Sequence, residues 1–229
     1  TVLRLPVRSS SPSTALVRHL SSWRPDGIDA PREDVAERLG QWLHVAEAIR
    51  LHAAQGQLAA VARRGARPQP ASLQQQLQQE LDRLRATLSR SIRTADAAHQ
   101  PDPNDLDTEF ALYHQRLNEL QRRMEMGVDA LRQHVRQQLA LVNPELAALD
   151  AVMDPLLAGR EQRLLSGLPG FLRARFVFLR EQAARCRAGD VADSLDWLPV
   201  FATEFEQLML AELELRLLPV VGLIESLDP

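Results

Sequence analysis

The stretch FALYHQRLNELQRRMEMGVDALRQHVRQQLALV, residues 110–142, decides the fold class. Its apolar side chains recur about every 3.6 residues, which is the period of an α-helix. They are Phe110, Tyr113, Leu117, Leu120, Met124, Val128, Leu131, Val135, Leu139 and Val142. Such a helix would be about 50 Å long at a rise of about 1.5 Å per residue. We therefore expect one very long amphipathic helix, capped by Asp107 and ended by Asn143-Pro144.

Further helices are expected after this one. Pro144 can open a helix that runs to about Ser166, which Pro155 would kink or divide. Another follows residues 167–169, and Gly189 would end it. The last begins near residues 193–194 and reaches about residue 218. Because it is apolar around much of its circumference, we expect it to lie at the centre of the fold.

Three helices are also expected before residue 107. Ser13 can cap a short one, a second carries an apolar stripe from Val35 to Ala53, and Ser72 can cap a third, rich in Leu and Gln. Charge, Gly and Pro at 63–71, and Pro and Asp at 99–106, indicate linkers. The prediction is an all-α bundle of about seven or eight amphipathic helices, including long antiparallel ones.

Composition agrees with a helical fold. Aromatic residues make up only 4% of the 229 residues, and Leu, Ala and Val dominate the apolar ones. We expect a single domain over residues 1–229, with its core over 107–227. No run of 18 apolar residues occurs, so no transmembrane helix is expected. The net charge of −3 and the lack of one strongly basic region argue against nonspecific nucleic-acid binding.

The sequence lacks the motifs that would indicate catalysis or cofactor binding. It contains no GxSxG, GxxxxGK or GxGxxG, and its six histidines form no HExxH pair. His44 and Glu47 could share a helix face, but no third ligand stands at metal-binding spacing. We therefore expect no enzyme active site, no cofactor and no metal.

The clearest electrostatic feature is a neighbouring pair of oppositely charged segments. Residues 160–187 hold seven arginines against two acids, and residues 190–229 hold nine acids against one arginine. The two segments could form an antiparallel hairpin, in which each exposed ion pair contributes about 0–1 kcal/mol. Alternatively, they could be docking faces for a protein partner. The candidate docking residues are Arg160, Arg163, Arg173, Arg175, Arg180, Glu204, Glu206, Glu212 and Glu214.

Several stretches resemble an uncharacterised proteobacterial family known only as a domain of unknown function. They are RLGQWL at 38–43, LDAVM at 149–153 with GRE at 159–161, and LAELELRLLPV at 210–220. These are patterns of a helical core and imply no activity. The resemblance implies genes that lie beside those for OmpA/MotB-like peptidoglycan-binding proteins and for membrane proteins with coiled-coil tails.

The sequence therefore favours a non-enzymatic interaction or scaffold subunit. Its expected partner is a coiled-coil or envelope-associated protein, and its expected place is the cytoplasm, including the periphery of the inner membrane; self-association stays open. One alternative is a helical ligand-binding bundle or small helical enzyme whose site comes from distant helices. Another is a nucleic-acid-binding regulator that uses Arg63, Arg64 and Arg67, which predicts steeply salt-dependent DNA binding.

Overall fold

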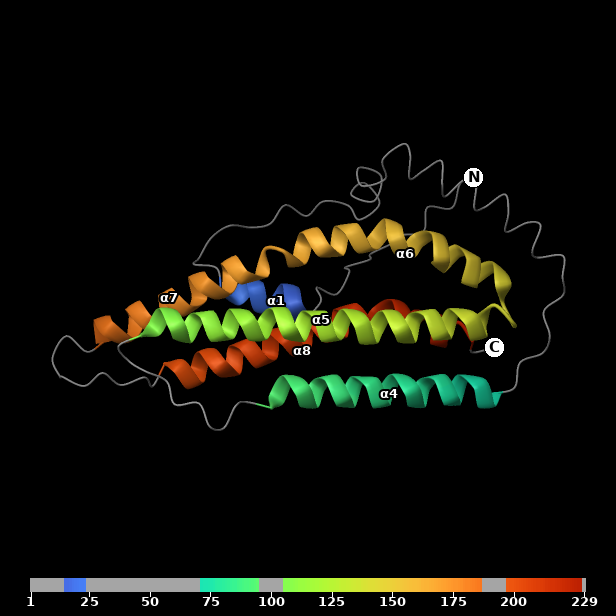
Figure 1. Cartoon of the computed structure of the whole chain (residues 1–229), viewed down its shortest axis with the longest axis horizontal. Coiled ribbons are helices and arrows are strands. Elements are labelled where there is room, and N and C mark those ends of the chain that lie inside the picture. Colours follow the sequence, from blue (N-terminus) through green and yellow to red (C-terminus); the bar gives the residue numbers. More distant parts are fainter. Residues whose placement is uncertain (1–14, 24–70, 95–104, 187–196, 228–229) are drawn as a thin grey trace, which may run out of the picture.

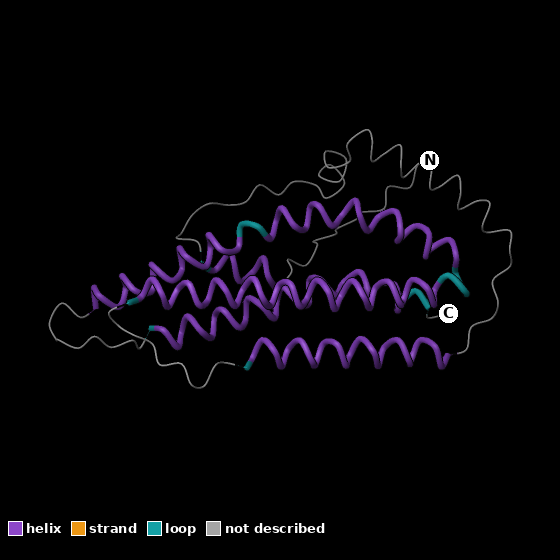
Figure 2. Tube along the Cα trace, in the orientation of Figure 1, coloured by secondary structure: helices purple, strands orange, loops and turns teal. Residues whose placement is uncertain are grey.

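The computed structural model describes residues 15–23, 71–94, 105–186 and 197–227 of the chain. The described residues form helices and no strand, which confirms the all-α class (Figures 1 and 2). The helices within the described ranges are α1 (Ala15–Ser22), α4 (Ala71–Arg93), α5 (Leu106–Leu139), α6 (Pro144–Leu165), α7 (Leu168–Cys186) and α8 (Leu198–Glu225). The helix expected from residue 31 onward lies outside the described residues, as do Arg63, Arg64 and Arg67.

Helix α8 lies at the centre, as its sequence predicts. It packs against α1, α4, α5 and α7, and the long helix α5 runs beside it (Figure 1). Side chains around much of α8 are buried, among them Phe205, Leu208, Leu213 and Leu217, whereas Val200 and Leu218 lie on an exposed stripe. Exposing apolar surface to water is unfavourable, so a helix that is apolar around much of its circumference is stable only where other helices cover it. The remaining helices therefore each present an apolar face to α8 or to its neighbours.

Two of the expected helix caps were wrong. Helix α5 is capped by Asp105 rather than Asp107, and the Asp105 carboxylate accepts a hydrogen bond from the Thr108 backbone N–H at 3.2 Å. Asp107 lies in the first turn, where its negative charge interacts favourably with the helix dipole. Ser72 lies inside α4, which begins at Ala71. Asn143 caps α6 through the Leu146 N–H at 3.1 Å.

The prolines of the last helices do not divide them. Pro155 lies within α6, which continues through it and curves over α5 (Figure 1). Pro219 lies within α8, which ends at Glu225 rather than near residue 218. A proline removes one backbone hydrogen bond but leaves packed side chains in place, so a well-buried helix can continue past it.

Helix α4 belongs to the same buried core as α5 and α8. Its Leu77, Leu81, Leu88 and Ile92 are buried, so the core of the described residues begins before residue 107. The helix approaches α5 closely at Gly127, where an added Cβ would lie 3.0 Å from Leu84 Cδ1. The two expected linkers end where helices begin, at residue 71 for α4 and at residue 106 for α5. Apart from Asp105, the other residues of both linkers lie outside the described part of the chain.

Aromatic rings join α5, α7 and α8 at one end of the bundle. Phe176 of α7 makes edge-to-face contacts with Phe110, Trp197 and Phe201 at centroid distances of 5.3, 4.9 and 5.1 Å. Tyr113 of α5 contacts the Phe201 ring at 4.9 Å. Edge-to-face pairs add about 0.5–1.5 kcal/mol beyond burial. This cluster fixes α7 on the core by one of its faces.

We expect Phe201→Ala to lower the free energy of unfolding by about 3–5 kcal/mol, because the ring is fully buried and its loss leaves a cavity. The neighbouring Val200→Ala should change it by less than about 0.5 kcal/mol, since Val200 is exposed. Urea unfolding followed by far-ultraviolet circular dichroism measures both. Equal effects at the two positions would contradict the orientation of α8.

Candidate docking surface

Helix α7 carries apolar side chains on two faces, and the described residues bury one of them. Its inner face is buried on the core and consists of Leu168, Leu172, Phe176 and Leu179. On the other side, Phe171, Val177 and Phe178 are 39%, 41% and 50% exposed. We call this second side the outer face of α7. An exposed cluster of large apolar side chains is typical of an interaction site.

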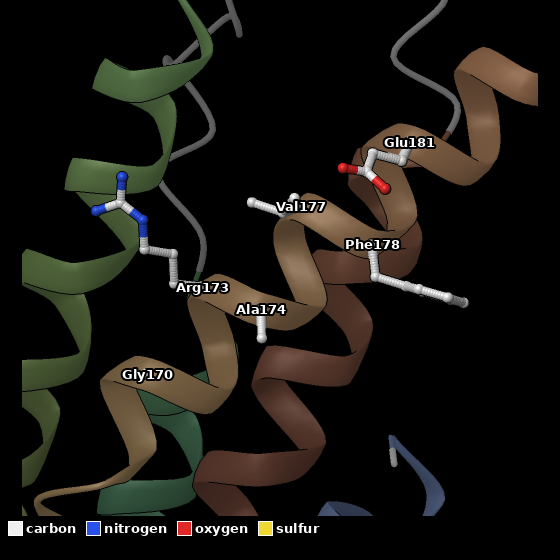
Figure 3. A pocket seen from close by; sticks show the side chains of 6 residues that line it. All are labelled: Gly170, Arg173, Ala174, Val177, Phe178 and Glu181. Atoms are coloured by element: carbon white, nitrogen blue, oxygen red, sulfur yellow. The ribbon is translucent and has the colours of Figure 1, made fainter. Parts of the chain in front are cut away.

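A shallow open groove of about 510 Å³ runs along the outer face. Gly170, Arg173, Ala174, Val177, Phe178 and Glu181 line it, all from α7 (Figure 3). Arg173 extends toward α5, where its guanidinium lies 5.6 Å from the centre of the Phe110 ring, while Phe178 extends to the opposite side (Figure 3). The small residues Gly170 and Ala174 form the low part between these two side chains.

Arg175 fastens the outer face to the rest of the bundle. Its guanidinium donates two hydrogen bonds to the Glu204 carboxylate of α8, at 2.7 and 2.5 Å. The hydrogen bonds that Arg175 donates to Glu204 raise the pKa of Arg175 above its ordinary value. The same group lies 5.9 Å from the Trp23 ring centre and 5.3 Å from that of Phe178. Arg175 thus holds α7, α8 and the end of α1 together, and its charge is already matched.

The other acids of α8 that were docking candidates face elements other than α7. Glu206 pairs with Arg93 at 3.4 Å and Glu214 with Arg85 at 3.0 Å, both on α4. Glu212 is fully buried, and it accepts hydrogen bonds from Gln121 Nε2 and from Arg216 Nε at 2.9 Å. Of the expected Arg–acid pairs between α7 and α8, the described residues contain Arg175–Glu204.

The arginine candidates have different places. Arg173 and Arg180 are exposed on α7, whereas Arg175 is engaged as described above. Arg160 and Arg163 belong to α6, but their side chains lie outside the described part of the structure. The outer face therefore keeps Arg173 and Arg180 beside its apolar side chains, and the apolar ones had not been singled out from the sequence.

A buried ion network between α5 and α6 was also missed. Arg132 donates to Asp150 and Asp154 at 2.5 and 2.6 Å, and Arg136 donates to the same two carboxylates at 2.8 and 2.5 Å. Burial, followed by the nearby Asp154 and Glu125 charges, raises the pKa of Asp129 beside it. The sequence does carry a pattern that could have indicated this network. Two arginines stand four residues apart on one helix, and two aspartates stand four residues apart on the next.

A family model matches residues 2–229 of the chain. The chain belongs to that family, Protein of unknown function (DUF3348). The resemblance to a domain-of-unknown-function family is thereby confirmed. No curated protein and no solved structure matches this DUF3348 chain. Two of the stretches that carried the resemblance contain buried polar groups, namely Asp150 in 149–153 and Glu212 in 210–220.

Two buried carboxylates of the DUF3348 chain are engaged inside the bundle. Its buried carboxylates at 150 and 212 accept hydrogen bonds from arginines, which leaves them poorly placed to accept a substrate proton. The described residues contain no group of three His, Cys, Asp or Glu side chains placed to hold a metal ion. In the same part of the chain, no helix combines the length and hydrophobicity needed to cross a membrane.

Arg175→Ala should lower the free energy of unfolding by about 1.5–3 kcal/mol, because Glu204 would lose charged hydrogen bonds in a partly buried place. Arg180→Ala, on the exposed side of the same helix, should change it by less than about 0.5 kcal/mol. Thermal and urea unfolding of both variants measure the difference. An unchanged free energy of unfolding in Arg175→Ala would show that this contact does not stabilise the packing of α7 on α8.

Proposed function

We propose that the DUF3348 chain is a non-enzymatic protein–protein interaction subunit that binds its partner through the outer face of α7. The observation that carries the proposal is the exposure of Phe171, Val177 and Phe178 on a helix whose opposite face is already buried. A helix needs one apolar face to pack on its own fold. The second face has no such role in the described residues, and binding to another protein would remove it from water.

The charges of the bundle support α7, rather than α8, as the docking helix. The candidate acids of α8 pair with α4, pair with Arg175 of α7 or lie inside the core, so a partner would have to break existing contacts to use them. Arg173 and Arg180, by contrast, are exposed beside apolar side chains. Exposed charges at the edge of an apolar patch steer a partner and fix its orientation.

The family resemblance supports a class of partner to test first. It points to an envelope-associated assembly of the OmpA/MotB kind, with the DUF3348 chain as an accessory subunit on the cytoplasmic side. This part of the proposal rests on association with neighbouring genes rather than on residues. An open groove on one helix fits this role better than that of an enclosing ligand site, which would bury most of a small molecule.

Phe178→Glu should abolish partner capture while leaving the melting temperature nearly unchanged, because the ring is half exposed and a charge there opposes an apolar contact. Val177→Glu, on the same face, should act alike. The measurement is affinity purification of the tagged chain from its native cells after mild crosslinking, with quantitative mass spectrometry.

Leu141→Glu is the matched control, since Leu141 is 72% exposed and belongs to the turn between α5 and α6. Proteins recovered with the wild type and this control, but lost with both α7 variants, would support the proposal. Equal recovery with all four proteins would overturn it.

A further inference from the structure

The outer face of α7 has the residue spacing that receives another helix. Gly170, Ala174, Val177 and Glu181 follow one another at steps of four, three and four residues. This is the spacing at which one helix meets a second along a shared seam. From Gly170 to Glu181 the seam covers about 16 Å at about 1.5 Å per residue, which corresponds to roughly three helical turns.

The shape of the groove also suits a helix. The side chains along the seam are small at Gly170 and Ala174, and an added Cβ at Gly170 would meet no atom within 4 Å. Phe178 and Arg173 stand on opposite sides of this low part (Figure 3). A ridge of Leu-sized side chains from a partner helix would fill it. A strand would find no edge to pair with, because the backbone of α7 is engaged within its own helix.

The charge around the groove is positive. Arg173 and Arg180 are exposed beside it, whereas the acid Glu181 lies 3.3 Å from Arg185 on the same helix. A second copy of this chain packed in parallel along α7 would bring the same arginines against each other, and like charges at an interface oppose binding. The face therefore calls for a partner of opposite charge.

We infer that the outer face of α7 binds an amphipathic helix of about three turns, whose apolar stripe lies in the groove and is flanked by acidic residues. This inference rests on the proposed function and names the chemistry of the partner. The apolar side chains Val177 and Phe178 supply the contact area, and Arg173 and Arg180 select the sign of the flanking charges. A basic apolar face would also suit an anionic membrane, and binding to anionic vesicles is one outcome of the test below.

The test uses two designed helical peptides with the same Leu and Ala stripe, one flanked by Glu and the other by Lys. Binding to the full chain is measured by fluorescence anisotropy at about 0.15 M salt, a condition in which exposed charges still act at contact distance. The wild type should bind the Glu-flanked peptide at least about tenfold more tightly, a difference equivalent to about 1.4 kcal/mol. The double variant Arg173→Glu with Arg180→Glu should reverse this preference.

The matched control carries Arg83→Glu and Arg122→Glu, which change two exposed arginines on α4 and α5. It should retain the preference of the wild type. The inference is overturned if neither peptide binds, if the two bind equally, or if the control reverses the preference as well. Two further results would overturn it and name another occupant. The wild type would bind neither peptide, but it would bind anionic vesicles or associate with itself, and Phe178→Glu would abolish that binding.

The peptide test and the capture test fail separately. Loss of native partners in Phe178→Glu, together with equal binding of the two peptides, would keep the proposed docking face and reject the acidic helix. A clear preference for the Glu-flanked peptide, without any change in native partners, would show a competent groove on a chain whose proposed function is wrong.

Discussion

The structure depends on one constraint, which is that α8 must be surrounded. Its apolar side chains occupy much of its circumference, and burial stabilises each large one by about 1.5–3 kcal/mol. Helices α1, α4, α5 and α7 together provide this cover. Each of them needs only one apolar face to do so. A helix that has a second apolar face, as α7 does, therefore presents it outward.

The same constraint determines where the charges lie. Glu212 stands on a side of α8 that is fully buried, so its carboxylate needs Gln121 and Arg216 to offset the loss of water. Glu206 and Glu214 lie where α4 covers α8, and they meet arginines of α4 there. Most acids of α8 are thus part of the bundle itself. The exposed arginines of α7 have a different setting, beside apolar side chains at the surface.

The sequence predicted the helices well because their apolar spacing is a local property. The apolar stripe of α5 identified a very long amphipathic helix, and the apolar residues around much of the circumference of α8 identified a central one. Caps were less predictable, since Asp105 and Asp107 both fit the pattern and only the backbone geometry at Thr108 chooses between them. Which helix covers which acid could not be read from the sequence. The pairing of Glu214 with Arg85 joins residues 129 positions apart.

The outer face of α7 illustrates the same limit. Phe171, Phe176, Val177 and Phe178 stand within eight residues of sequence, and the spacing shows that they occupy more than one side of a helix. It does not show which side the rest of the chain covers. Phe176 lies in the aromatic cluster with Trp197 and Phe201, and this contact leaves the other three outside. A docking surface of this kind becomes visible only once the core is assembled.

Amide hydrogen exchange of the full chain, resolved by peptide and followed by mass spectrometry, tests most directly whether α8 is the centre on which the other helices depend. Amides between Phe205 and Val220 should exchange only through global unfolding, and the amides of α7 should exchange measurably faster through local opening. Exchange of α8 as fast as that of α7 would contradict the account.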